Sequence, residues 1–182
     1  INNKFFIKKL QTNLFKNEKL ALETANFIKK HKIELDEKFS IFINSGPGSF
    51  SGVRISLAVV KGIQLVNNVK IYSYNNFLLN VAPYLKKKGD IITIQKTNNF
   101  YYYCKGSFKN KYHFTSPKKI NFNKFNKKNV LVVIPKEIKN DEIIQKQNFK
   151  KIKIAEFNLK NIDFLIKNKL VENKLIKPLY LS

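Results

Sequence analysis

A glycine- and serine-rich segment at residues 45–54 joins a predicted strand to a predicted helix, and it constrains the fold more than any other segment. Three glycines and a proline directly after the strand at 39–44 allow a tight turn in which backbones approach closely. The helix that follows extends to about residue 66. We therefore predict a strand–turn–helix unit, which is typical of α/β proteins. The loop residues that we single out are Gly46, Pro47, Gly48, Ser49, Phe50, Ser51, Gly52 and Arg54.

The loop does not match the common nucleotide-binding motifs. Five residues separate Gly46 from Gly52, whereas a phosphate-binding Walker loop has four and continues with Lys and Ser or Thr. The dinucleotide motif needs a third glycine where Ser51 stands. Ser49 and Ser51 can cap the following helix, whose positive N-terminal end favours an anion. The loop is therefore predicted to be structural, or at most a minor anion site.

The helix after the loop is apolar on two sides, which predicts that both sides are buried. One face covers the predicted sheet, and it carries Val53, Leu57 and Val60. The other face needs a partner protein or another part of this chain, and both alternatives remain open. The small residues on that face would let a neighbouring helix approach closely. The predicted interface consists of Ile55, Ala58, Val59, Gly62 and Ile63 on this helix and Ala21, Ala25 and Ile28 on the helix at 20–30.

Strands and helices alternate along the chain, most clearly in its first half, and this favours an α/β fold. A lysine-rich segment with a glycine, residues 86–89, is the best candidate linker, so we expect a first lobe at 1–88 and a second at 89–182. The predicted strands lie at 4–10, 39–44, 70–73, 90–96, 100–105 and 130–134, and the predicted helices at 20–30, 52–66, 75–87, 137–147 and 163–169.

The chain is strongly basic, with 35 Lys and Arg residues against 12 Asp and Glu and a formal net charge of +23. Drift of a genome towards A and T accounts for abundant lysine, and an RNA-facing surface is the alternative. The lysines are spread along the whole chain, and Arg54 is its single arginine. Tyr101, Tyr102 and Tyr103 would stack on bases if exposed, but alternation along a strand favours burial.

Few residues support catalysis or metal binding. Cys104 is the single cysteine and is expected to be a buried apolar residue. His31 and His113 lie far apart, so no metal site is predicted, and no base is placed beside Ser49 or Ser51. No apolar run reaches the roughly 20 residues of a membrane span, and no leader opens the chain, so we expect a cytoplasmic protein without membrane contact. The chain has no methionine and begins at Ile1, which suggests a missing start.

The segment from Ser45 to Ile55, with Lys61 and Gly62 further along the helix, resembles the signature of the TsaB family. The family pattern is Gly-Pro-Gly-Ser-Phe-Thr-Gly-(Leu/Val)-Arg-Ile, and here Ser51 replaces the threonine. These bacterial proteins take part in making threonylcarbamoyladenosine in transfer RNA. The resemblance extends over most of residues 1–105 and resumes only at the tail, residues 177–181.

The resemblance implies an actin-like ATPase (ribonuclease H-like) fold of two similar lobes, with the first truncated at its N-terminus. It implies an inactive relative of the catalytic protein TsaD that dimerises with TsaD through first-lobe helices, here 20–30 and 52–66. ATP and metal would then belong to TsaD and to the small ATPase TsaE, the contact with tRNA would be indirect, and a homodimer is a further option.

Two departures from the family pattern limit what the resemblance implies. The opening strand with its phosphate-binding turn is absent, and Gln95-Lys96-Thr97 stands where the second lobe usually begins with Asp-Ala-Arg. Both departures weaken a nucleotide role for this chain. The alternatives are a stand-alone basic RNA-binding module and an active actin-like ATPase or kinase.

Overall fold

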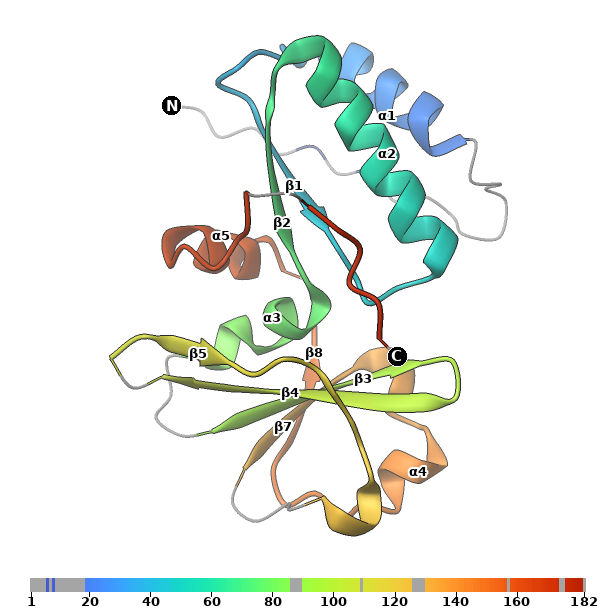
Figure 1. The fold of residues 1–182 in the computed structure, drawn as a ribbon, viewed down its shortest axis with the longest axis vertical. Helices are drawn as coiled ribbons and strands as arrows, with labels where there is room; N and C mark the ends of the chain where they lie inside the picture. Colours follow the sequence, from blue (N-terminus) through green and yellow to red (C-terminus); the bar gives the residue numbers. More distant parts are fainter. Residues whose placement is uncertain are drawn as a thin grey trace.

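The computed structural model describes residues 6, 8, 19–85, 90–108, 110–125, 130–156, 158–173 and 176–181. The elements form two parts, one above the other in Figure 1. The upper part holds a parallel pair of strands with two helices on one side, and the lower part holds a six-stranded sheet with helices on both faces. The mixed α/β architecture predicted from the sequence is confirmed.

The upper part is a strand–helix–strand unit. Strand β1 (Ser40–Asn44) pairs in parallel with β2 (Lys70–Tyr74), and α2 (Phe50–Asn67) connects them. Parallel neighbours need such a crossover. Leu57 of α2 packs with Ile43 and Ile71, so one apolar face of the helix covers the sheet as predicted. Helix α1 (Lys19–Lys30) lies beside α2 on its outer side.

The lower part is built around β3 (Ile91–Thr97), which is antiparallel to β4 (Phe100–Phe108) and parallel to β7 (Leu131–Pro135). Strand β8 (Ile152–Ala155) extends the sheet beyond β7, and both β5 (Tyr112–Phe114) and β6 (Lys118–Lys119) pair with β4. Ile92 and Ile94 face one side of the sheet with Tyr101, whereas Ile91 faces the other side.

Short helices cover both faces of the lower sheet. Helix α3 (Asn76–Val81), the 3₁₀ turn η2 (Ala82–Tyr84) and α5 (Leu159–Lys167) lie between this sheet and the upper part. The opposite face is covered by η3 (Phe122–Lys124), η4 (Lys136–Ile138) and α4 (Glu142–Gln145). A sheet buried on both faces explains why β7 is apolar throughout and why β3 begins with three isoleucines in its first four residues.

Several predicted boundaries were wrong. The helix expected at 75–87 ends as an α-helix at Val81 and continues as a 3₁₀ turn that contains Pro83, because proline donates no backbone hydrogen bond. The helix expected at 137–147 is two short pieces, and Asp141 caps the second. The last helix begins at Leu159, four residues earlier than predicted, because Asn158 caps it.

The strands β5, β6 and β8 were not predicted. Nearly all of the strand expected at 4–10 lies outside the described residues, as does the linker at 86–89. The division into lobes at 1–88 and 89–182 stays a prediction.

The C-terminal segment returns to both parts of the molecule (Figure 1). The backbones of Glu172 and Ser73 exchange hydrogen bonds of 2.7 and 2.9 Å. Ile176 joins the upper core, whereas Leu179 and Leu181 pack against Phe77, Tyr102 and Cys104 below. This segment therefore connects the two parts.

Candidate functional site

The glycine-rich loop is held by its own protein partners. The Gly46 N–H donates to Asn44 Oδ1 at 2.9 Å, and the carbonyls of Gly46 and Pro47 accept from the backbone N–H and Nδ2 of Asn76 at 2.8 and 2.7 Å. Gly46 has φ +109°, a conformation that favours glycine. These contacts fix the end of β1 against the start of α3, which supports the structural interpretation of the loop.

Ser49 is the N-cap of α2, and its hydroxyl accepts from the Gly52 N–H at 3.2 Å. Ser51 lies inside the first turn rather than at the cap. The predicted capping role is confirmed for Ser49 alone.

The single arginine lies in an aromatic cluster at the start of α2. Arg54 Nε donates to the Tyr180 hydroxyl at 2.7 Å, and its guanidinium carbon lies 3.7 Å from the centroid of the Phe50 ring. The Phe50 and Tyr180 rings are 5.4 Å apart, and both remain about half exposed. The cluster attaches the C-terminal segment to α2. The tail at 177–181 was noted from the sequence, but Tyr180 was not paired with Arg54, because 126 residues separate the two.

An open groove of about 510 Å³ lies between α1 and α2. Seven of the eight predicted interface residues line it, whereas Ile55 is half-buried outside the lining. The lining residues are Ala21, Thr24, Ala25, Ile28, Lys29, Leu35, Ala58, Val59, Gly62, Ile63, Val66 and Asn67. The other five lining residues were not in the predicted interface: Thr24, Lys29, Leu35, Val66 and Asn67. The structure thus brings together residues from two helices that only their apolar spacing had linked.

The described part of the chain leaves this groove uncovered. A Cβ added at Gly62 would meet no atom within 4 Å, and Ala21, Ala25 and Ala58 are exposed. Val66 is 83% exposed. The second apolar face of α2 was predicted to be covered either by a partner protein or by another part of this chain. In the described structure α1 lies alongside this face but does not cover it.

The remaining candidate residues have structural positions. Cys104 is buried, its thiol donates to the Thr115 carbonyl at 2.7 Å, and burial raises the pKa of the thiol. Tyr101 and Tyr102 are buried on opposite faces of β4, as the alternation predicted. The His31 ring packs against Phe27, with ring centroids 4.6 Å apart and the rings tilted by 55°. Among the described residues, no cluster of three or more His, Cys, Asp or Glu is arranged to hold a metal.

Length and hydropathy together exclude a membrane-crossing helix among the described residues.

Sequence comparison links the chain to one curated protein, and no family model matches it. The chain is 38% identical over 80 residues to the tRNA threonylcarbamoyladenosine biosynthesis protein TsaB of Buchnera aphidicola subsp. Baizongia pistaciae (strain Bp). The match covers 41% of this chain and 36% of that protein, so the chain spans about a third of this relative. The predicted resemblance to the TsaB family is confirmed.

Two solved structures share the fold. One is described as an uncharacterized protein with similarity to peptidase YEAZ from Pseudomonas aeruginosa, with a TM-score of 0.62 and 12% identity over 91% of this chain and 83% of that one. The other, YeaZ from Pseudomonas aeruginosa, gives a TM-score of 0.62 and 13% identity over 90% and 84% of the two chains. At such identities the likeness shows the fold alone, and it confirms the predicted actin-like class.

Proposed function

We propose that this chain is a non-catalytic partner subunit in the synthesis of tRNA threonylcarbamoyladenosine, and that the α1–α2 groove docks on a TsaD-like threonylcarbamoyltransferase. The observation that carries the proposal is the groove itself, because seven residues chosen from the sequence as an interface line one open apolar surface. The name of the Buchnera relative supports the pathway. The protein would act in the cytoplasm.

The shape of the groove suits a helix of the partner. The groove is lined by several small residues, so the backbone of a partner helix can approach closely; these are Ala21, Ala25, Ala58 and Gly62. Val66, which also lines the groove, is exposed and available for apolar contact. Burying one exposed valine or leucine side chain on association contributes about 1.5–3 kcal/mol. A few such residues can therefore stabilise a complex without any ion pair.

The proposal assigns no catalytic residue to this chain. The Ser49 hydroxyl is used as a helix cap, and the raised pKa of the buried Cys104 thiol disfavours the nucleophilic thiolate. ATP and metal would be bound by the TsaD-like subunit and a TsaE-like ATPase, and contact with tRNA would be indirect.

The first experiment is light scattering after size exclusion, with this protein and the TsaD-like protein of the same genome mixed at moderate and at high salt. We expect a one-to-one complex that persists as salt rises, because apolar contacts are not screened. A second copy of this chain in the groove would instead give a homodimer when the protein is measured alone.

A matched pair of variants tests the groove. Gly62→Trp places a large side chain where a Cβ meets open space, so the helix should form while the partner is excluded. Asn26→Trp adds the same bulk to an exposed position of α1 that does not line the groove. We expect at least about a 100-fold loss of affinity for the first variant and little change for the second. If the Gly62→Trp and Asn26→Trp variants bind the TsaD-like protein with equal affinity, the groove is not part of the interface.

The alternative of an RNA-binding module is favoured by the net charge of +23. Tyr101 and Tyr102 are buried, so two of the three tyrosines that would stack on bases if exposed are inaccessible to RNA. A complex with transfer RNA that dissociates steeply as salt rises, with no TsaD-like complex, would favour this alternative.

A further inference from the structure

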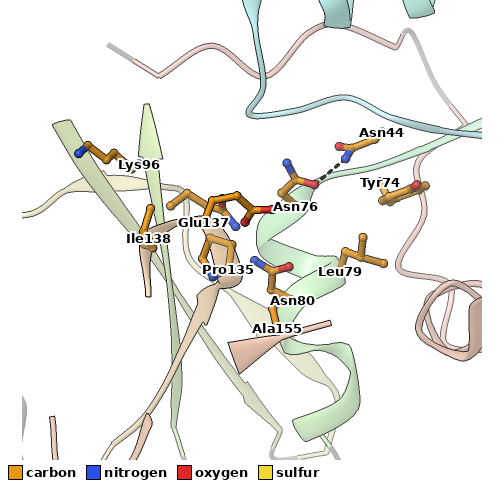
Figure 2. A pocket seen from close by; sticks show the side chains of 11 residues that line it. Asn44, Tyr74, Asn76, Leu79, Asn80, Lys96, Pro135, Glu137, Ile138 and Ala155 are labelled. Atoms are coloured by element: carbon orange, nitrogen blue, oxygen red, sulfur yellow. Dashed lines mark hydrogen bonds between the residues drawn. The ribbon is translucent and has the colours of Figure 1, made fainter. Parts of the chain in front are cut away.

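A cavity of about 390 Å³ lies between the two parts of the molecule, and none of its lining residues lines the groove. Asn44 and Asn76, which hold the glycine-rich loop, belong to its lining. Figure 2 shows Asn76 and Asn80 projecting from α3 towards Pro135, Glu137 and Ile138 of the lower part. The lining residues are Asn44, Tyr74, Asn76, Leu79, Asn80, Gln95, Lys96, Pro135, Glu137, Ile138 and Ala155.

Three polar side chains that have no hydrogen-bond partner among the described residues lie where α3 faces β3. Thr93 and Gln95 are two residues apart on β3 and therefore point to the same side of the sheet as Ile91, which packs with Val81 of α3. Thr93 Oγ1 and Asn80 Nδ2 are buried and unpaired. Gln95 is only 7% exposed, and within the described ranges its side chain makes no hydrogen bond.

The other two carboxamides in the lining behave differently. Asn44 and Asn76 bond to each other, and Asn76 also donates to the Pro47 carbonyl. Buried polar groups are normally paired, since leaving one unpaired is costly. The unpaired groups at Asn80 and Gln95 therefore point to a molecule that completes their hydrogen bonds.

The charges around the cavity disfavour an anion. Lys96 Nζ is paired with Asp141 Oδ2 at 2.7 Å, and the Glu137 carboxylate also lines the cavity. No residue of the glycine-rich loop from Gly46 to Gly52 takes part in the lining. A phosphate group would find neither free positive charge nor a ring of backbone amides here.

We propose that this cavity binds a small molecule without net charge that presents a hydrogen-bond donor beside an acceptor in one plane. A carboxamide offers that pair, and so does the edge of a nucleobase. The free amides of Asn80 and Gln95 each offer the complementary donor and acceptor. The proposal is independent of the docking groove, which lies between α1 and α2 and shares no lining residue with the cavity.

Calorimetric titration of the full chain with L-glutamine, L-glutamate, adenosine and ATP tests the proposal. Glutamine and glutamate differ only in the amide, and adenosine and ATP share the base but differ in charge. Ligands of this size reach dissociation constants of about 1 mM or tighter. We expect glutamine or adenosine to bind at least about tenfold more tightly than its charged counterpart. The tighter binder of the two shows whether the cavity prefers a carboxamide or a nucleobase.

Two variants separate binding from folding. Gln95→Met and Asn80→Leu keep the side-chain size but remove the unpaired groups, so each should weaken binding about tenfold or more. Each should also raise the melting temperature of the free protein, by about 3 °C, because an unsatisfied buried group is lost. A fall in melting temperature would mean that the amides serve the fold and would overturn the proposal.

A third variant tests the charge argument. Glu137→Gln removes the carboxylate of the lining. It should reduce the difference in affinity between glutamine and glutamate, without altering the affinity for glutamine by more than about twofold. Absence of binding by any of the four molecules, or ATP binding more tightly than adenosine, would also overturn the proposal.

Discussion

The upper and lower parts of the molecule contain similar apolar residues but bury them very differently. Five consecutive residues of β3, from Ile91 to Gln95, are buried. In the upper part, α1 has no buried residue in the described structure, and α2 has only Leu57. One part uses its apolar side chains for its own core, and the other keeps a large share of them on its surface.

This difference in burial indicates that the lower part mainly provides stability, whereas the upper part provides a surface for recognition. The lower sheet has covering elements on both faces, so most of its apolar area is removed from water within the chain itself. Helices α1 and α2 leave an apolar groove open, and an exposed apolar patch of this kind marks an interaction site. We therefore expect substitutions below to change folding and substitutions in the groove to change binding.

The largest expected effect contrasts a buried side chain of the lower sheet with an exposed side chain of α2. Ile94→Ala removes a side chain that is 0% exposed, and it should lower the free energy of unfolding by about 2–5 kcal/mol. Leu65→Ala removes a side chain of similar size that is 88% exposed on α2, and it should change that free energy by less than about 0.5 kcal/mol. Urea denaturation of both variants measures the difference. Comparable losses would show that the upper helices are as important to folding as the lower sheet.

Two glycines sharpen the comparison within the upper part. Gly46→Ala places a side chain at φ +109°, and we expect a loss of about 1–3 kcal/mol of stability. Gly62→Ala meets open space in a helix, and we expect a gain of about 0.5–1 kcal/mol. The two melting temperatures should therefore move in opposite directions from the wild type. A loss at Gly62 would mean that the groove is less open than its surroundings indicate.

Local pattern predicted the upper part well. The strand, turn and helix from residue 39 to 67 have nearly the expected boundaries, because glycine, serine and apolar periodicity all act over a few residues. The same periodicity placed Ala21, Ala25 and Ile28 on the face that lines the groove, together with Ala58 and Gly62.

Contacts between residues far apart in the chain could not be predicted from local sequence patterns. Strand β8 reads as Ile-Lys-Ile-Ala, and it becomes a strand because β7 offers an edge for parallel pairing. The cavity between α3 and β3 was not foreseen either, because single Asn and Gln residues in a chain rich in asparagine carry no signal until the fold places them together. Arg54 was singled out from the sequence, but its partner Tyr180 was not.

The aromatic cluster tests how firmly the C-terminal segment is attached to the upper part. Tyr180→Phe removes the hydroxyl that accepts from Arg54 Nε at 2.7 Å but keeps the ring beside Phe50. Because the cluster is about half exposed, we expect a loss of only about 0.5–1 kcal/mol. Hydrogen exchange of the backbone amides of residues 176–181 should quicken in this variant, while exchange in β3 should stay unchanged. Unchanged exchange in the tail would show that Leu179 and Leu181 alone hold it.

The smallest expected effect is a dependence of stability on pH that arises from one ion pair of the lower part. The hydrogen bond from Lys96 Nζ is the main cause that lowers the pKa of Asp141 from its ordinary value of 3.8. The folded pKa is below the unfolded one, so this contribution is complete above about pH 4 and is lost as the pH falls through the folded value. The same pair raises the pKa of Lys96 from 10.5, so on the alkaline side the contribution is complete below that value and is lost as the pH rises through the folded one.

Asp141→Asn separates this ion pair from the helix cap. Asparagine can still accept the Ile143 N–H that Asp141 caps at 3.0 Å, so only the charge is removed. We expect the variant to be slightly less stable at neutral pH, and to lose less stability than the wild type when the pH falls from 5 to 2. The matched control is Glu142→Gln, which removes the exposed carboxylate that lies 3.8 Å from Lys146 and should have almost no effect. If Asp141→Asn follows the acid curve of the wild type, the pair adds nothing to the lower part, and the contrast in stability rests on apolar burial alone.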